Sequence, residues 1–251
     1  MDTHGFDISA LLSPPDILFA KKVLCIQPHP DDNEIGMGGI IAVLAKNGCE
    51  IHYLTVTNGD QGCPTLSKEK AAAVRHEETI AAGKHLGAAH FHFLDHGDGT
   101  LSAAYPLSLE IISVIRKVQP DVIFCPDPWL NYECHYDHII TGKAAAAAFC
   151  ASGRRYFEDG GETSPWNASA IGFYFTAKPN TVIDISETFE QKFEAIKLHK
   201  SQISAETEAM YRVYFGMKAQ ELAQDKDFSL GEGLKVLSPL HTHCFVDAEK
   251  I

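Results

Sequence analysis

The chain has 251 residues and a formal net charge of -12, with 45% hydrophobic and 22% charged residues. This composition is ordinary for a globular protein, and the length is enough for one large domain or two small ones. The acidic balance argues against a nucleic-acid partner, because no basic stripe exists to displace counterions, and it also disfavours an anionic membrane surface.

The sequence predicts a cytoplasmic protein without a membrane segment. No apolar run approaches the ~18 residues that span a bilayer. The first residues, Met1 to Gly5, lack the basic start and apolar body of a signal peptide. Seven cysteines are scattered without a Cys-x-x-Cys pair, which is typical of reduced thiols and not of a disulfide framework.

Strand-like and helix-like segments alternate along most of the chain. After an N-terminal arm, residues 1–20, apolar runs predict strands at 23–26, 51–56, 91–94, 122–125, 171–175 and 182–185. Helix-like stretches lie at 34–47, 68–86, 105–118 and 135–151. This alternation favours an α/β fold with a mostly parallel sheet.

The remaining segments predict a loop and a C-terminal extension. Gly160 to Pro165 reads as a loop, and residues 187–224 read as one or two amphipathic helices. We therefore predict a single domain over 1–251, in which 187–251 forms a helical extension and tail.

The most informative segment follows the first predicted strand. Pro28-His29-Pro30-Asp31-Asp32 places an imidazole and two adjacent carboxylates where parallel α/β sheets gather their chemistry. Burying two neighbouring charges is costly unless something binds them, and a metal ion would do so. Alternatively, Asp31, Asp32 or Asn33 caps the following helix. Capping accounts for one carboxylate, but it leaves the histidine and the second acid unexplained.

A second segment of similar design follows the fourth predicted strand. Residues 126–138 contain prolines, acids and two histidines, His135 and His138, at a helix start. Hydrolytic zinc sites use about three protein ligands and leave one position open. His29 and Asp32 would supply two of them, and a histidine from this segment the third. Surface histidines near a helix cap are the alternative, but two such segments at central strand ends favour a metal.

Other histidines form weaker patterns. His76-Glu77-Glu78-Thr79-Ile80 begins like the zincin helix motif but has Ile80 where the second ligand is needed. His90 and His92 alternate on one face of a predicted strand. We predict that both are non-ligands, because such histidines are more often solvated or hydrogen-bonded.

The combined pattern resembles the PIG-L/LmbE family of zinc-dependent N-deacetylases. The resemblance rests on His29-Pro30-Asp31-Asp32 and His135-x-x-His138, and it extends over roughly residues 20–245. Within the family, the chain is most similar to the diacetylchitobiose deacetylases of chitin degradation. Segments 57–62, 75–78 and 86–87 further support the family resemblance, and 126–130, 178–180, 199–202 and 231–233 support the closer one. The resemblance implies a Rossmann-like three-layer sandwich.

The resemblance also implies roles for individual residues. One zinc ion per chain would be bound by His29, Asp32 and His138. Asp31 would be the general base, His135 would stabilise the oxyanion, and Asp137 would tune His135.

Further roles implied by the resemblance concern the substrate and the assembly. Arg75 and Asp98 would contact sugar hydroxyls. His241 would enter the active site of a neighbouring subunit, which implies a homo-oligomer, a trimer or a hexamer. Two departures from the family pattern bear on substrate preference: Tyr136 replaces the usual proline, and Asn33 stands where many relatives carry Glu.

The predicted function is hydrolysis of the N-acetyl group of a small N-acetylglucosamine-type sugar, diacetylchitobiose or GlcNAc, with release of acetate. One alternative is a deacetylase of a GlcNAc conjugate of the thiol-precursor type. Another is a non-catalytic metal- or sugar-binding protein. Asp31 and His135 favour catalysis, since simple binding requires neither.

Overall fold

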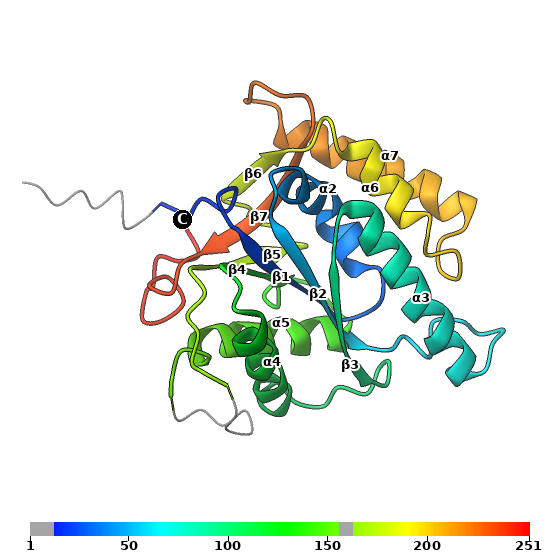
Figure 1. Cartoon of the computed structure of the whole chain (residues 1–251). Helices are drawn as coiled ribbons and strands as arrows, with labels where there is room; N and C mark the ends of the chain where they lie inside the picture. The colour runs from blue at the N-terminus through cyan, green and yellow to red at the C-terminus, as the bar shows by residue number, and fades with distance from the viewer. Residues whose placement is uncertain (1–12, 156–162) are drawn as a thin grey trace, which may run out of the picture.

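The computed structural model describes residues 13–155 and 163–251, which form a seven-stranded sheet in the order β3-β2-β1-β4-β5-β7-β6 (Figure 1). Most of the predicted N-terminal arm, residues 1–12, and Gly160-Gly161 of the predicted loop lie outside the described residues. The strands are β1 (Lys22–Gln27), β2 (Glu50–Thr57), β3 (His90–His96), β4 (Val122–Pro126), β5 (Ala170–Tyr174), β6 (Thr181–Asp184) and β7 (Gly231–Leu237). The helices are α2 (Asp32–Lys46), α3 (Lys68–Leu86), α4 (Ala104–Val118), α5 (Tyr136–Ala151), α6 (Phe189–Ile196) and α7 (Ala205–Leu222).

Strands β1 to β5 are parallel, which confirms the predicted mostly parallel α/β fold. The strand order reverses between β1 and β4, so their carboxyl ends flank a topological switch point, where α/β proteins bind ligands. Strand β7 is antiparallel to both β5 and β6. Strand β7 was not predicted from the sequence. The segment 187–251, predicted to be a helical extension and tail, contributes this strand as well as helices.

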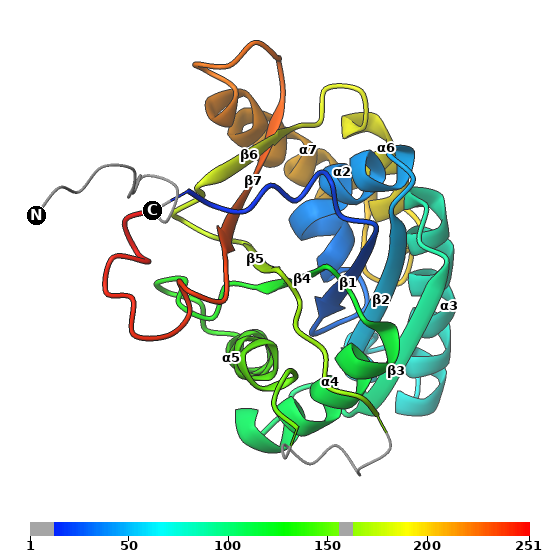
Figure 2. The same ribbon diagram turned by 60° about the vertical axis from the view of Figure 1, so that its left-hand side comes forward.

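Helices cover both faces of the sheet, as the three-layer prediction requires. Helices α2, α3, α6 and α7 lie on one side, and α4 and α5 lie on the other (Figure 2). Successive residues of a strand point to opposite faces, so Tyr53 of β2 belongs to the first core and Leu54 to the second. All strands of the described residues belong to this one sheet.

The helix ends explain why some boundaries were easy to predict. Helix α3 begins after Ser67, whose hydroxyl accepts a hydrogen bond from the backbone N–H of Lys70, and ends at Gly87 in the left-handed conformation, with φ of 97°. Helix α2 begins differently: Asp31 occupies the N-cap position, but its side chain makes no cap hydrogen bond with any described residue. Capping therefore does not explain this carboxylate. In the described parts of the chain, no helix is both long and apolar enough to cross a bilayer.

Candidate active site

The residues predicted to bind a metal meet at the switch point of the sheet. His29 and Asp32 follow β1, and His138 lies in the first turn of α5, directly after β4. Because β1 and β4 are paired neighbours, their carboxyl ends bring these two segments to the same edge of the sheet. Residues more than one hundred positions apart in sequence thus come into contact through the topology.

The distances between these three side chains suit a tetrahedral zinc site. Asp32 Oδ2 lies 3.2 Å from His29 Nδ1, and Asp32 Oδ1 lies 3.3 Å from His138 Nε2. Zinc–ligand bonds of about 2.0–2.1 Å place neighbouring tetrahedral ligands about 3.3 Å apart. All three side chains are at most 13% exposed. The donor types fit a zinc ion, and both contacts of Asp32 have a suitable spacing. The group whose ligand atoms all lie within 4.8 Å of one another joins His29 and His138 to His135.

A second layer of carboxylates surrounds His29. Its Nε2 lies 3.2 Å from Asp137 Oδ2 and 3.4 Å from Asp98 Oδ1, and Asp137 also accepts a hydrogen bond from the backbone N–H of Gly99 at 2.7 Å. A metal-binding histidine commonly has a carboxylate on its other ring nitrogen. The resemblance implied that Asp137 tunes His135, whereas the structure places its carboxylate against His29.

The negative charge of this cluster favours a cation. Burial lowers the pKa of His29, but its hydrogen bonds to Asp137, Asp32 and Asp98 outweigh burial and raise the pKa to about 12. The pKa of His138 is also raised, because the attraction of Asp32 exceeds the effect of burial. A metal ion and these protons compete for the same nitrogens and carboxylates, so metal binding would release the protons.

Asp31 differs from the neighbouring Asp32 in conformation and in partners. Its backbone has φ of 131°, a strained value for a residue with a side chain, and such strain concentrates at functional sites. Its Oδ2 lies 3.2 Å from Arg75 Nη2, and the Asp31 side chain is 14% exposed. Burial and the charge of Asp32 raise the pKa of Asp31 to about 6. Asp31 is thus a carboxylate beside the ligand cluster, held by an arginine.

Arg75 is buried beneath the segment that carries Asp31. Its guanidinium donates hydrogen bonds to the carbonyl oxygens of Pro30 at 2.8 Å and Gly59 at 3.3 Å, and its Nη1 lies 3.7 Å from Asp98 Oδ2. Gly59 has φ of 66°, and a Cβ there would lie 2.5 Å from Arg75 Nη1, so this position requires glycine. The sequence analysis expected Arg75 and Asp98 to contact sugar hydroxyls. In the structure both contact protein groups of the site.

His135 joins the cluster from the N-cap position of α5. Its ring centroid lies 4.4 Å from that of His29 and 5.2 Å from that of His138, and one nitrogen from each of the three rings lies within 4.8 Å of the others. Burial and the neighbouring His29 lower the pKa of His135.

The His241 side chain is buried against residues of its own C-terminal segment. It is 3% exposed, accepts a hydrogen bond from the backbone N–H of Ser238, and packs 5.2 Å from the ring of Phe245. Reaching a neighbouring subunit would require this segment to rearrange.

A cleft of about 870 Å³ opens beside Asp32 and His138. Its wall includes residues that the sequence analysis missed. Phe175 stacks on His138 at 6.0 Å and has a left-handed backbone, with φ of 54°. Tyr211 of α7 lines the same cleft as Asp32, and burial, with smaller effects of the Asp31 and Asp32 charges, raises its pKa. The helical pattern over 187–224 predicted a helix here but gave no sign of which face meets the site.

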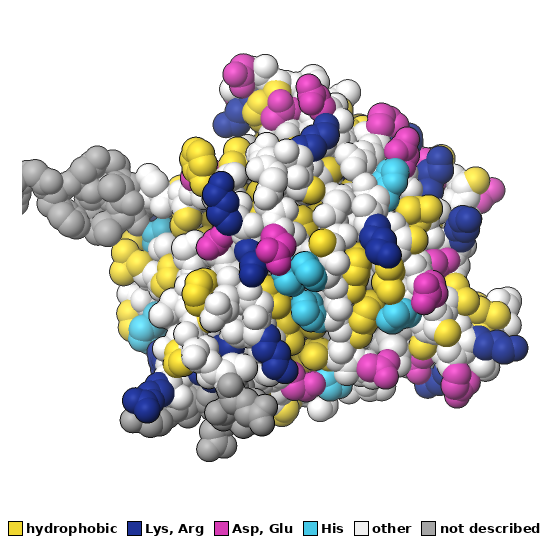
Figure 3. All heavy atoms as spheres, in the orientation of Figure 1, with side chains coloured by type: hydrophobic (Ala, Val, Ile, Leu, Met, Phe, Trp, Pro, Cys, Tyr) yellow, Lys and Arg dark blue, Asp and Glu magenta, His cyan; other side chains and the backbone are white. Residues whose placement is uncertain are grey.

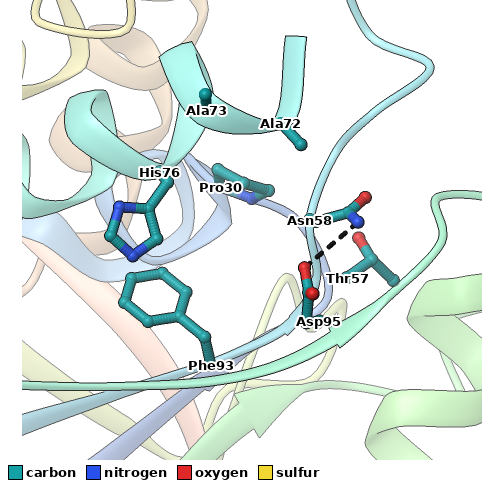
Figure 4. Close-up of a pocket in the computed structure, with 8 residues that line it drawn as sticks. All are labelled: Pro30, Thr57, Asn58, Ala72, Ala73, His76, Phe93 and Asp95. Carbon is teal, nitrogen blue, oxygen red and sulfur yellow. Dashed lines mark hydrogen bonds between the residues drawn. The ribbon is translucent and has the colours of Figure 1, made fainter. Parts of the chain in front are cut away.

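A smaller pocket of about 190 Å³ lies at Pro30, between the start of α3 and the ends of β2 and β3 (Figure 4). Within it, the Asn58 side-chain amide donates a hydrogen bond to Asp95 at 3.2 Å, and the His76 ring packs 4.1 Å from Phe93. None of the predicted metal ligands lines this pocket. The larger cleft is therefore the one that can present a substrate to the cluster.

The fold and the site place this chain in the class of α/β enzymes that hydrolyse amides at a metal centre. Comparison with known families agrees: residues 24–149 match the PIG-L family, described as GlcNAc-PI de-N-acetylase. The chain belongs to the PIG-L family.

Individual relatives narrow the class to deacetylases. The chain is 35% identical to a diacetylchitobiose deacetylase of Thermococcus kodakarensis, an alignment that covers 96% of this chain and 95% of that protein. It is 28% identical to a 1D-myo-inositol 2-acetamido-2-deoxy-alpha-D-glucopyranoside deacetylase of Rhodococcus jostii, over 85% of this chain and 92% of the relative. Among solved structures, the N,N'-diacetylchitobiose deacetylase of Pyrococcus horikoshii, complexed with its inhibitor MPG, matches with a TM-score of 0.90 and 32% identity, covering 100% of this chain and 99% of that one. The chain is thus a deacetylase, and the predicted Rossmann-like sandwich is confirmed.

Proposed function

We propose that this enzyme removes the N-acetyl group of diacetylchitobiose or GlcNAc, using one zinc ion per chain. The observation that carries the proposal is the contact of Asp32 with both His29 and His138, with Asp31 in the same segment and a wide cleft beside Asp32 and His138. The similarity to diacetylchitobiose deacetylases along nearly the whole chain supports the choice of sugar.

The chain's own residues suit amide hydrolysis. When bound, zinc polarises the acetamide carbonyl and makes a water molecule more acidic. Asp31 accepts a proton from the attacking water, because Arg75 holds its carboxylate beside the ligands. His135 donates a hydrogen bond to the oxygen that becomes negative, a contribution of about 3–4 kcal/mol when one such donor is removed. The amine leaves with a proton from His135 or Asp31, and acetate carries the oxygen of water.

The cleft suits a small sugar. Its volume of about 870 Å³ falls in the range of about 300–1,000 Å³ typical of small-molecule sites. Its wall combines aromatic side chains, such as Phe175, Tyr211 and Phe215, with polar groups such as Glu133 and Lys218. Aromatic faces pack against sugar rings, and the polar groups can bond hydroxyls.

The test is acetate release from GlcNAc and diacetylchitobiose, with zinc content measured on the same samples. We expect Asp31→Asn to keep its zinc and lose most turnover, because only the proton acceptor is removed. We expect His138→Ala to lose one equivalent of zinc relative to the wild type, as well as turnover. An Asp31→Asn enzyme with a near-normal rate would end the assignment of the base, and a His138→Ala variant with the full wild-type zinc content would end that of the ligand.

A GlcNAc conjugate is the second candidate substrate. It is favoured by the similarity to the Rhodococcus jostii deacetylase, whose name gives a substrate that joins the amino sugar to inositol. A panel of free and conjugated substrates compared by kcat/KM separates the two. A zinc-containing protein that releases no acetate from any of them would be the non-catalytic binding protein considered above.

We also propose a homo-oligomer, a trimer or a hexamer. Helix α7 presents four exposed apolar side chains at helical spacing, Met210, Val213, Tyr214 and Met217, each at least 57% exposed. Exposed apolar stripes of this kind mark association surfaces. Light scattering of the purified chain gives the subunit number, and a monomer at all concentrations contradicts the proposal.

A cytoplasmic location and a role in chitin degradation complete the proposal. All seven cysteines are free thiols, and Cys134, Cys150 and Cys244 are exposed, as suits a reducing compartment. Cell fractionation tests the location, and growth of a deletion strain on chitin oligosaccharides tests the role.

A further inference from the structure

Four polar side chains gather at the sheet edge formed by β2 and β3, far along the strands from the active site. Glu50 and His90 are the first residues of these strands, whereas the active site lies at the strands' carboxyl ends. His52 and His90 are register partners, Glu50 precedes His52 by two residues, and His92 follows His90 by two. All four therefore point to the same face of the sheet. In the space-filling view, histidine side chains lie side by side near the middle of the face shown (Figure 3).

Three of these residues aim donor atoms at a common point. Glu50 Oε1 lies 2.7 Å from His52 Nε2 and 3.4 Å from His90 Nε2, and one ligand atom from each residue lies within 4.8 Å of the other two. The His52 and His90 rings stack with centroids 4.2 Å apart. The 3.4 Å separation resembles those within the candidate catalytic cluster, 3.2 Å and 3.3 Å, whereas the 2.7 Å contact is a hydrogen bond that an ion would have to open.

His92 contacts this cluster through the ring of His52. His52 Nδ1 lies 3.1 Å from His92 Nε2. If His52 used Nε2 toward a metal, its Nδ1 would carry the proton and donate it to His92, which fixes the ring as outer partners of metal ligands do.

We propose that Glu50, His52 and His90 form a second binding site for a divalent transition-metal ion such as zinc. One carboxylate and two imidazoles are a common zinc donor set, and the partial exposure of Glu50 and His90 leaves a fourth position to water. The ion exchanges with solvent and ties β3, the edge strand, to β2. The sequence analysis rated His90 and His92 as non-ligands. That prediction rested on the sequence of β3 alone. The register of β2 against β3 brings Glu50 and His52 beside His90.

Two features of the surroundings compete with the metal. Lys22 Nζ lies 3.8 Å from Glu50 Oε1, so its charge opposes a cation, although its side chain is 32% exposed and free to turn away. Without a metal, His52 can instead donate from Nε2 to Glu50 and accept from His92, which gives an ordinary hydrogen-bonded chain. The experiment must separate this chain from a metal site.

The experiment measures zinc bound per chain after equilibrium dialysis of the full-length protein at fixed free zinc. His138→Ala removes the candidate catalytic site, so any remaining equivalent reports the second cluster. We expect this variant to retain one equivalent and to lose it when His90→Asn or Glu50→Gln is added. His85→Asn is the matched control, because His85 forms a surface pair with Glu194 at 3.0 Å that resembles one arm of the cluster. In the His138→Ala background, it should keep the equivalent.

A second readout is thermal stability, because an ion that binds only the folded chain raises the unfolding midpoint. Zinc should raise the midpoint of His138→Ala, and it should do so less after His90→Asn. Lys22→Gln should tighten zinc binding by removing the opposing charge. Equal zinc content and equal midpoint shifts in His138→Ala with and without His90→Asn and Glu50→Gln would overturn the proposal. Because no readout depends on acetate release, failure here would leave the proposed function intact.

Discussion

Replacing Arg75 tests how the protein keeps Asp31 in place. The guanidinium is 4% exposed and contacts the carbonyl oxygens of Pro30 and Gly59 as well as the carboxylates of Asp31 and Asp98. Arg75→Met keeps the aliphatic stem but removes every one of these contacts. It leaves two carboxylates and two carbonyl oxygens without their donor.

The magnitude follows from burial. Removing one partner of a buried ion pair costs about 3–5 kcal/mol, because the remaining charge stays desolvated. The Asp31 side chain is 14% exposed, so little solvent is available to replace the arginine. We therefore expect Arg75→Met to lower the free energy of unfolding by about 3–5 kcal/mol. Arg75→Lys should cost less, since an ammonium keeps the charge but cannot reproduce the planar fork.

Urea unfolding gives the stability, and zinc content and acetate release under native conditions give the effect on the site. Arg116→Met is the matched control: Arg116 of α4 is also 4% exposed and donates to the carbonyl oxygens of Ser152 and Arg154, just after the end of α5 and away from the cluster. Arg116→Met should lose stability but keep turnover in the folded fraction. Wild-type stability and turnover in Arg75→Met would refute the reasoning.

Three further outcomes are expected. Lys192→Met should lose about 3–5 kcal/mol of stability in urea, because Lys192 pairs with Glu232 in the core and donates to the carbonyl oxygen of Ile35; unchanged stability would contradict this pairing. Tyr211→Phe should lower kcat/KM by roughly tenfold, the loss of one hydrogen bond, whereas Tyr105→Phe on α4, outside the cleft, should not; equal effects would remove Tyr211 from the site. Chelation should abolish acetate release and zinc should restore it, and turnover in metal-free protein would exclude a zinc requirement.

Local patterns explain why most of the fold could be predicted. The predicted helix 68–86 agrees with α3 at both ends, because Ser67 and Gly87 are strong boundary signals. Strand β7 was missed, because the glycines of Gly231-Glu232-Gly233 are typical of a turn and the charge of Glu232 is unusual in a buried strand. The strand depends on distant partners: Glu232 accepts a hydrogen bond from the backbone N–H of Ile40 and pairs with Lys192. No window of neighbouring residues contains that information.

In the candidate site, too, some residues could be predicted from local motifs and others could not. His29, Asp32 and His138 could be found because each lies in a short motif at a strand end. The place of Arg75 could not, since its partners Pro30 and Gly59 come from two loops that only the folded sheet brings together. Asp137 is a similar case: it lies next to His138 in sequence, but its carboxylate reaches across the switch point to His29.

The division of roles between Asp31 and Asp32 follows from one backbone conformation. With φ of 131° at Asp31, the two adjacent carboxylates point to different partners, Asp32 to the histidines and Asp31 to Arg75. Burial raises the pKa of both, but His138 and His29 outweigh burial at Asp32 and hold its pKa well below the usual value, whereas the pKa of Asp31 rises to about 6. Neighbouring acids pushed apart in this way are suited to different tasks, one as a permanent anion for a metal and one as a proton acceptor. A strained φ costs about 1–3 kcal/mol, and the bond from Arg75 to the Pro30 carbonyl holds the chain in it. We therefore propose that Arg75 acts on the chemistry by keeping the two neighbouring carboxylates in separate roles.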